Sequence, residues 1–163
     1  MSCCKRLVTD MAPQRKRARV GDILELEAGG HFAYLQYIGK HPEYGDAVLV
    51  SPRLQPRQPS VTENIFSDGY VAFYPVTAAA SQGLVKVVGH VSPPALPSRL
   101  RRAGVRSGPR VDTWIIEDES GEVVKAKLSE EELKFPIAAI WNHDLLIQRV
   151  AEGWTPQREG RGS

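Results

Sequence analysis

The sequence predicts a mainly β, α+β fold: a curled antiparallel sheet or partial barrel of about seven short strands, with a C-terminal helix packed on it. Three observations indicate this class. Short stretches alternate apolar and polar residues at the period of a strand. Glycine (14) and proline (12) recur between those stretches, which favours turns over long helices. A stretch near the C-terminus has helical spacing instead.

The first two predicted strands are residues 23–27 and 32–38. Leucine alternates with glutamate in the first, so we expect one buried face and place Glu25 on the other. The second stretch is aromatic and apolar on both faces, which is typical of a central strand. Gly29-Gly30 between them supplies the positive φ angles of a tight turn, so the pair is predicted to be a hairpin.

The remaining strands are shorter and are bounded by turn residues. They are predicted at residues 47–50, 70–74, 84–91, 114–117 and 122–128. The last two flank Asp118-Glu119-Ser120-Gly121 and form a second hairpin. Residues 61–66 fit either a strand or a turn. The proline- and arginine-rich segment 92–109 is predicted to be a long surface loop.

Helical signals occur at three places. Residues 76–82 are alanine-rich and end at Gly83, which predicts a helix of one to two turns. Ser129 followed by Glu132 matches a helix-capping pattern. Residues 142–152 place Leu145, Leu146, Arg149 and Val150 at helical spacing, with Asn142 as N-cap.

Charge and composition predict one folded domain between two tails. The formal net charge is +2, but residues 1–19 contain six basic groups and one acid. We therefore expect residues 1–19 to be a disordered basic tail, residues 20–155 to be a single β-rich domain, and residues 156–163 to be a second disordered tail.

The two cysteines, Cys3 and Cys4, are adjacent, and neighbours rarely have the geometry of a disulfide. A reducing compartment is therefore expected. No apolar run reaches the roughly 18–20 residues of a membrane span, and the N-terminus lacks the apolar region of a secretory signal. These observations predict a cytoplasmic protein that does not enter a membrane.

The sequence contains no pattern of catalytic or metal-binding residues. Its four histidines are far apart, and none has ligand spacing to another histidine or to a cysteine. A nucleophile elbow, a phosphate-binding loop and a dinucleotide fingerprint are all missing. We expect no metal, no cofactor and no enzymatic activity, although an enzyme or ligand-binding protein with a pocket built from distant residues stays open.

A partner-binding surface is the leading functional hypothesis. The acidic turn at residues 117–119 is the densest exposed group of acids, although carboxylates at a solvated turn also explain it. The tyrosines of the predicted strand 70–74 could lie on a binding surface, although core packing also explains them. Trp114 and Trp141 are expected in the core. The candidate partner-binding residues are Glu117, Asp118, Glu119, Tyr70 and Tyr74.

The alternative hypothesis is a nucleic-acid-binding β module. A run of arginines without an intervening acid attracts phosphate, although such runs are more often solvated. Glutamates on the predicted strands would repel phosphate, which is an argument against this function. The candidate contacts are Arg99, Arg101, Arg102, Arg106 and Arg110.

Several stretches together resemble the immunity protein 26 family of bacterial polymorphic toxin systems. They are Gly21-Asp22-Ile23, residues 70–77, residues 83–89, Pro136-Ile137, Ile140-Trp141 and Gly153-Trp154. The resemblance covers roughly residues 19–155 and implies a β-rich inhibitor that binds a cognate toxin domain, with no catalytic residues. Immunity proteins that face nucleases are often clearly acidic, whereas this chain is slightly basic, so the toxin need not be a nuclease.

Overall fold

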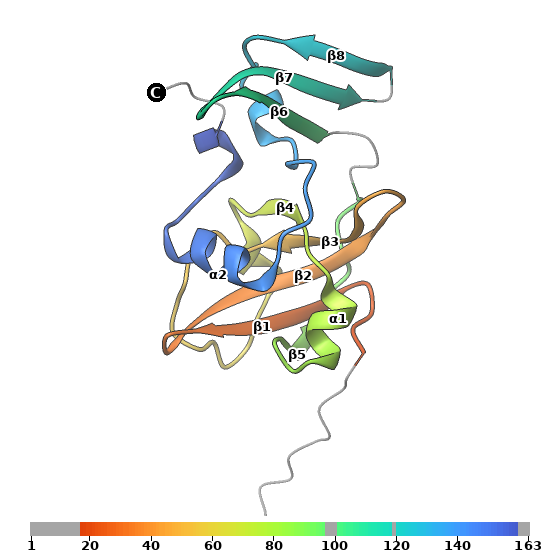
Figure 1. The fold of residues 1–163 in the computed structure, drawn as a ribbon. Coiled ribbons are helices and arrows are strands. Elements are labelled where there is room, and N and C mark those ends of the chain that lie inside the picture. The colour runs from red at the N-terminus through yellow and green to blue at the C-terminus, as the bar shows by residue number, and fades with distance from the viewer. Residues whose placement is uncertain (1–16, 97–100, 119, 160–163) are drawn as a thin grey trace, which may run out of the picture.

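A computed structural model describes residues 17–96, 101–118 and 120–159. These residues form eight strands in two antiparallel sheets, with two α-helices and three short 3-10 turns. The mainly β class is confirmed. The strands do not form one curled sheet, however, because they divide between a five-stranded and a three-stranded sheet, and the smaller sheet lies at one end of the molecule (Figure 1).

The five-stranded sheet has the order β4-β3-β2-β1-β5. Its strands are β1 (Asp22–Ala28), β2 (His31–His41), β3 (Gly45–Val50), β4 (Tyr70–Phe73) and β5 (Lys86–His90). The aromatic strand β2 is central, as predicted. The turn between β1 and β2 has φ values of 60° at Gly29 and 83° at Gly30, which a residue with a side chain adopts only with strain.

The three-stranded sheet has the order β6-β7-β8 and consists of β6 (Arg101–Ser107), β7 (Arg110–Asp118) and β8 (Gly121–Lys125). The β7–β8 hairpin confirms the second predicted hairpin. The prediction of a loop over residues 92–109 is wrong for β6, which pairs with β7 from end to end. Only Ala103 and Val105 follow a period-two apolar pattern in its sequence, so the strand is specified mainly by this pairing rather than by its own residues.

Both predicted helices are present as α1 (Val76–Ser81) and α2 (His143–Ala151). The side chain of Asn142 caps α2 by accepting a hydrogen bond of 2.8 Å from the Leu145 amide. The 3-10 turns are η1 (Glu63–Phe66), η2 (Glu132–Lys134) and η3 (Pro156–Glu159).

The turn η3 corrects the prediction of a disordered tail over residues 156–163. Residues 156–159 fold back onto the domain, and Pro156 is buried. Residues 160–163 lie outside the described part of the chain, as do residues 1–16 of the predicted N-terminal tail.

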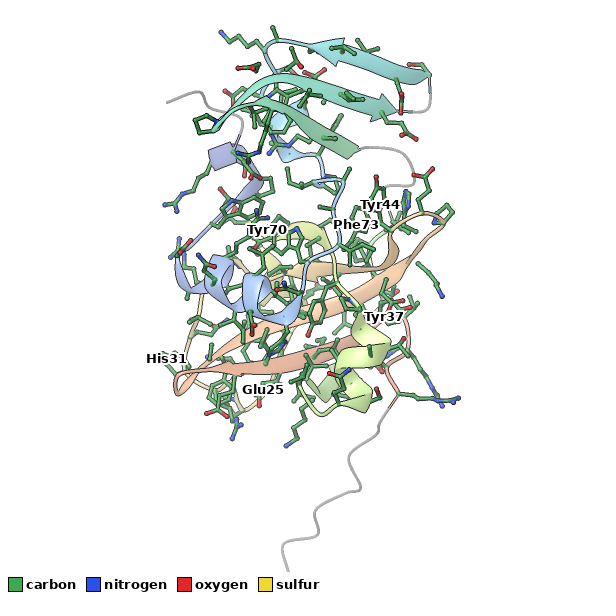
Figure 2. All side chains as sticks on the ribbon, in the orientation of Figure 1. Glu25, His31, Tyr37, Tyr44, Tyr70 and Phe73 are labelled. Atoms are coloured by element: carbon green, nitrogen blue, oxygen red, sulfur yellow. The ribbon has the colours of Figure 1, made fainter. Side chains whose placement is uncertain are left out.

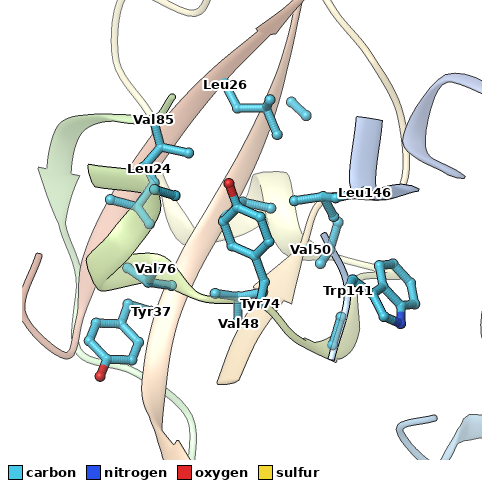
Figure 3. Packing of buried hydrophobic residues seen from close by; sticks show 14 of the residues in the cluster. Leu24, Leu26, Tyr37, Val48, Val50, Tyr74, Val76, Val85, Trp141 and Leu146 are labelled. Carbon is cyan, nitrogen blue, oxygen red and sulfur yellow. The ribbon is translucent and has the colours of Figure 1, made fainter. Parts of the chain in front are cut away.

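The five-stranded sheet is covered on both faces. The main hydrophobic cluster lies between one face and the two helices, and includes Leu24, Tyr74, Val76, Trp141 and Leu146 (Figure 3). On the opposite face, residues 51–69 cross the sheet. There Ile65 and Phe66 pack with Ile23, Phe32 and Tyr34.

The smaller sheet has its own core on one face. Trp114 and Ile116 of β7 pack against Leu128 and Leu133, and all four side chains are buried. The expectation that Trp114 and Trp141 are core residues is confirmed. Burial of each large apolar side chain contributes about 1.5–3 kcal/mol. The cluster under the smaller sheet, with four buried residues, therefore contributes less to stability than the main cluster, with seventeen.

Candidate functional site

Tyr70 and Tyr74 lie in the core rather than on a surface. The two residues are 6% and 1% exposed, and the ring of Tyr70 (labelled in Figure 2) packs against the rings of Trp141 and Trp154. The Tyr74 hydroxyl hydrogen-bonds to Nδ1 of His143 at 2.9 Å, and burial raises the pKa of Tyr74 to about 12. Their assignment to a partner-binding surface is therefore wrong, because the helical side of the sheet is covered as completely as its other side.

The predicted acidic turn is the end of the β7–β8 hairpin. Glu117 of β7 lies opposite Glu122 of β8, and Asp118 lies opposite Gly121. Glu122 is exposed and Glu117 is half-buried. Glu119 and the side chain of Asp118 fall outside the described residues.

The predicted arginine contacts divide into three groups. Arg102 is fully buried, so its assignment to a nucleic-acid surface is wrong. The Arg106 side chain is 56% exposed. Arg99 and the side chains of Arg101 and Arg110 lie outside the described part of the structure.

In the described part of the chain, one face of the three-stranded sheet contributes to none of the hydrophobic clusters, and we call it the outer face. Strand alternation places it opposite Trp114 and Ile116, and register aligns Ala103, Ile115 and Val124 across it. Val124 is 67% exposed and Val105 is 44% exposed. The outer face comprises Ala103, Val105, Thr113, Ile115, Glu117, Glu122 and Val124. It is an apolar strip that ends at Glu117 and Glu122, and the register also places Arg101 opposite Glu117.

Strand β8 borders this face. Among the described strands it pairs with β7 alone, so its second edge presents backbone N–H and C=O groups to the surroundings. Four of its five residues are exposed. An apolar face beside an open edge is the combination that edge-to-edge protein recognition uses.

A different kind of site lies between the smaller sheet and η3. Arg102, Arg106 and Arg149 surround Glu159 there. Nη2 of Arg149 is 3.6 Å and Nη2 of Arg106 is 3.9 Å from Oε1 of Glu159. Burial lowers the pKa of Arg102 to about 10, and Glu159 partly opposes the shift. We call these four residues the arginine cluster.

Aromatic rings hold two of these guanidinium groups. The Arg149 guanidinium lies 4.3 Å from the ring centres of both Trp141 and Trp154, and that of Arg102 lies 4.6 Å from the ring centre of Trp114. Sequence reasoning missed Arg149 and Glu159 as site residues. One signal was available: Arg149 shares its helical spacing with the buried Leu146 and Val150, and an arginine at such a position is buried with them.

A third candidate is the cavity of about 570 Å³ beside Glu25, Arg57 and Lys86. The Glu25 carboxylate is already engaged there, because Tyr34 donates to its Oε2 at 3.2 Å and Arg57 lies 3.0 Å from its Oε1. The Glu25 carboxylate therefore borders the cavity as an acceptor of hydrogen bonds from within the protein. This arrangement does not provide the free acid and base that proton transfer requires.

The chain was compared with protein-family models, curated proteins and solved structures. None of them matches it. In the described ranges, no three His, Cys, Asp or Glu side chains gather as the ligands of a metal ion. None of the helices described combines the length and the hydropathy that crossing a bilayer demands.

Proposed function

We propose that this chain is a non-enzymatic protein that binds a partner protein through the outer face of its three-stranded sheet and thereby occludes the partner's own site. The observation that carries the proposal is the apolar strip of Val105, Ile115 and Val124 on a sheet whose opposite face carries the buried Trp114 and Ile116. A valine that is two-thirds exposed on such a face gains by association, because contact removes its apolar surface from water.

The chemistry of the face also indicates the kind of partner. The exposed Glu122 borders the apolar strip at the hairpin end, so a complementary partner carries an apolar patch with a basic group beside it. The open edge of β8 can add backbone hydrogen bonds to an extended segment of that partner. These features fit stoichiometric blocking by a preformed surface, which needs no catalytic group.

We propose further that the partner is a bacterial toxin domain and that the protein acts as its immunity protein in the cytoplasm. The support is the resemblance of residues 19–155 to the immunity protein 26 family, together with the exposed apolar strip of the outer face. The nucleic-acid alternative has less support, because Arg102 is buried and Arg106 faces Glu159. It predicts binding to DNA or RNA that weakens steeply with salt, which fluorescence anisotropy at low salt tests.

The test uses a toxin domain encoded beside this gene and the variant Val124→Lys. Co-expression with the wild-type chain is expected to restore growth, and titration calorimetry is expected to give a one-to-one complex. A buried interfacial lysine forfeits the contact of the valine and pays for desolvation, so Val124→Lys should weaken binding about tenfold to a hundredfold. Val88→Lys, at a 37%-exposed valine on β5, is the matched control and should bind normally.

Two results would overturn this proposal. One is unchanged affinity and protection by Val124→Lys while the variant remains folded by circular dichroism. The other is the failure of the wild-type chain to bind or protect against any toxin domain encoded beside it.

A further inference from the structure

We propose that the cavity at the arginine cluster binds a small organic carboxylate. The cavity measures about 250 Å³ and lies between the smaller sheet, the segment before α2, and η3. Arg106, Arg149 and Glu159 provide its polar lining, and Val111, Trp114 and Ile137 provide apolar walls. The site is distinct from the outer face, because Trp114 and Arg106 lie on the opposite side of the sheet from Val105.

The first argument is charge. The guanidinium groups of Arg106 and Arg149 line the cavity with the single carboxylate of Glu159, whose charge also acts on the fully buried Arg102. A buried cation loses its hydration and is stabilised by a nearby anion. The cluster therefore favours a further negative charge at the cavity.

The second argument is unused hydrogen-bonding capacity. The distances of 3.6 Å and 3.9 Å from Glu159 to Arg149 and Arg106 exceed the range of a hydrogen bond, so Glu159 compensates their charge without saturating their donors. Within the described residues, Nη1 of Arg149, which lines the cavity, is buried without a partner, and so is Oε2 of Glu159. Buried donors without acceptors are costly, and the cost is recovered where a ligand supplies the acceptor.

The third argument concerns the body of the ligand. Apolar walls formed by Val111, Trp114 and Ile137 accommodate a hydrocarbon group rather than a naked ion. An apolar cavity of roughly 150 Å³ already admits a benzene ring, so a cavity of 250 Å³ has room for a ring with one carboxylate. The planar fork of an arginine is matched to a planar carboxylate, which it can bind through two parallel hydrogen bonds.

Glu159 sets the strength of this interaction. Its carboxylate lines the same cavity and competes with the ligand for Arg106 and Arg149. Two substitutions should consequently act in opposite directions. Removing a guanidinium should weaken carboxylate binding, and removing the charge of Glu159 should strengthen it.

The experiment is a calorimetric titration of the full chain with sodium benzoate at constant ionic strength and neutral pH. We expect a dissociation constant of about 1 mM or tighter, and at least tenfold weaker binding of the neutral isostere benzamide. Arg106→Gln should weaken benzoate binding about threefold to tenfold, because it removes a largely exposed guanidinium. Glu159→Gln should strengthen it by a similar factor.

Arg158→Gln is the matched control. Arg158 is the neighbour of Glu159 on η3, and its Nη1 donates to the Glu152 carbonyl rather than lining the cavity. Its affinity for benzoate should equal that of the wild type. Melting curves of each variant separate a loss of binding from a loss of folding.

The proposal is overturned if benzoate does not bind at 10 mM, if benzamide binds as well as benzoate, or if folded Arg106→Gln retains full affinity. Binding of inorganic phosphate in preference to benzoate also overturns it, because the apolar walls would then have no role. These outcomes leave the proposed function untouched, since that function depends on Val124 and a protein partner.

Discussion

At the scale of single residues, the Glu25 carboxylate fixes residues 51–69 to the sheet. Its Oε2 accepts from the Tyr34 hydroxyl, which itself accepts from the Gln58 amide at 2.8 Å. Its Oε1 accepts from Nε of Arg57 at 3.1 Å, and the Arg57 guanidinium lies over the Phe32 ring. One buried acid therefore joins two strands to the segment that covers them.

Glu25→Ala should lower the free energy of unfolding by about 1–3 kcal/mol, because the Tyr34 hydroxyl loses its buried acceptor. Urea denaturation followed by circular dichroism measures the change. Glu27→Ala is the control, since Glu27 is exposed on the same strand and should change stability by less than about 0.5 kcal/mol. Equal stability of Glu25→Ala and the wild type would show that these hydrogen bonds carry no net stabilisation.

His143 gives the fold a dependence on pH. Burial lowers its pKa below the usual value of 6.5, and Asp144 partly opposes the shift. The unfolded chain then binds a proton more readily than the folded chain, so stability is fully present above about pH 6.5 and falls as the pH drops toward the folded-state value. His143→Gln should reduce this fall, measured as the melting temperature between pH 7.5 and 5. An identical pH profile for the variant would contradict the assignment.

At the scale of elements, helix α2 depends on its N-cap. Asn142→Ala should destabilise the protein by about 1 kcal/mol, because the Leu145 amide at the first turn loses its acceptor. Chemical denaturation measures the loss. Asn142→Asp restores an acceptor and a favourable charge at the helix start, so it should retain stability near that of the wild type. A loss as large in Asn142→Asp would point to a cause other than capping.

The capping pattern at Ser129 is followed by only a short helical turn, because Pro136 lies soon after it. The Ser129 amide donates to Oε2 of Glu132 at 2.8 Å, and the Glu132 amide donates to Oγ of Ser129 at 3.2 Å, so the predicted reciprocal cap is present. It begins only the three-residue turn η2. Pro136 disfavours the helical conformation of Phe135, which is extended with ψ of 143°.

At the scale of the whole molecule, the two sheets should differ in local stability. The main cluster contains seventeen buried side chains, whereas the cluster under the smaller sheet contains four. Hydrogen exchange measured by mass spectrometry should therefore show faster exchange in β7 and β8 than in β1 and β2. Uniform protection across both sheets would indicate that they open as one cooperative unit.

The sequence by itself determined the local features of this protein. Alternation located the hairpin strands, and the glycine pair 29–30 and the polar turn 118–121 located their ends. Asn142 located the start of α2. These signals act between residues close in the chain. The prediction of the β6 region failed for the same reason. Its strand is fixed by pairing with β7 and not by its own residue pattern.

Only the tertiary structure decided which residues are available for function. It buried Tyr70, Tyr74 and Arg102, left Val124 on an open face, and brought Arg149 and Glu159 to Arg102 and Arg106 of β6. A strand pattern states which residues share a face, but it does not state what covers that face. The segments that pack on a face and bury it are distant in the chain. The candidate surfaces could therefore be identified only from the arrangement of both sheets and the C-terminal turn.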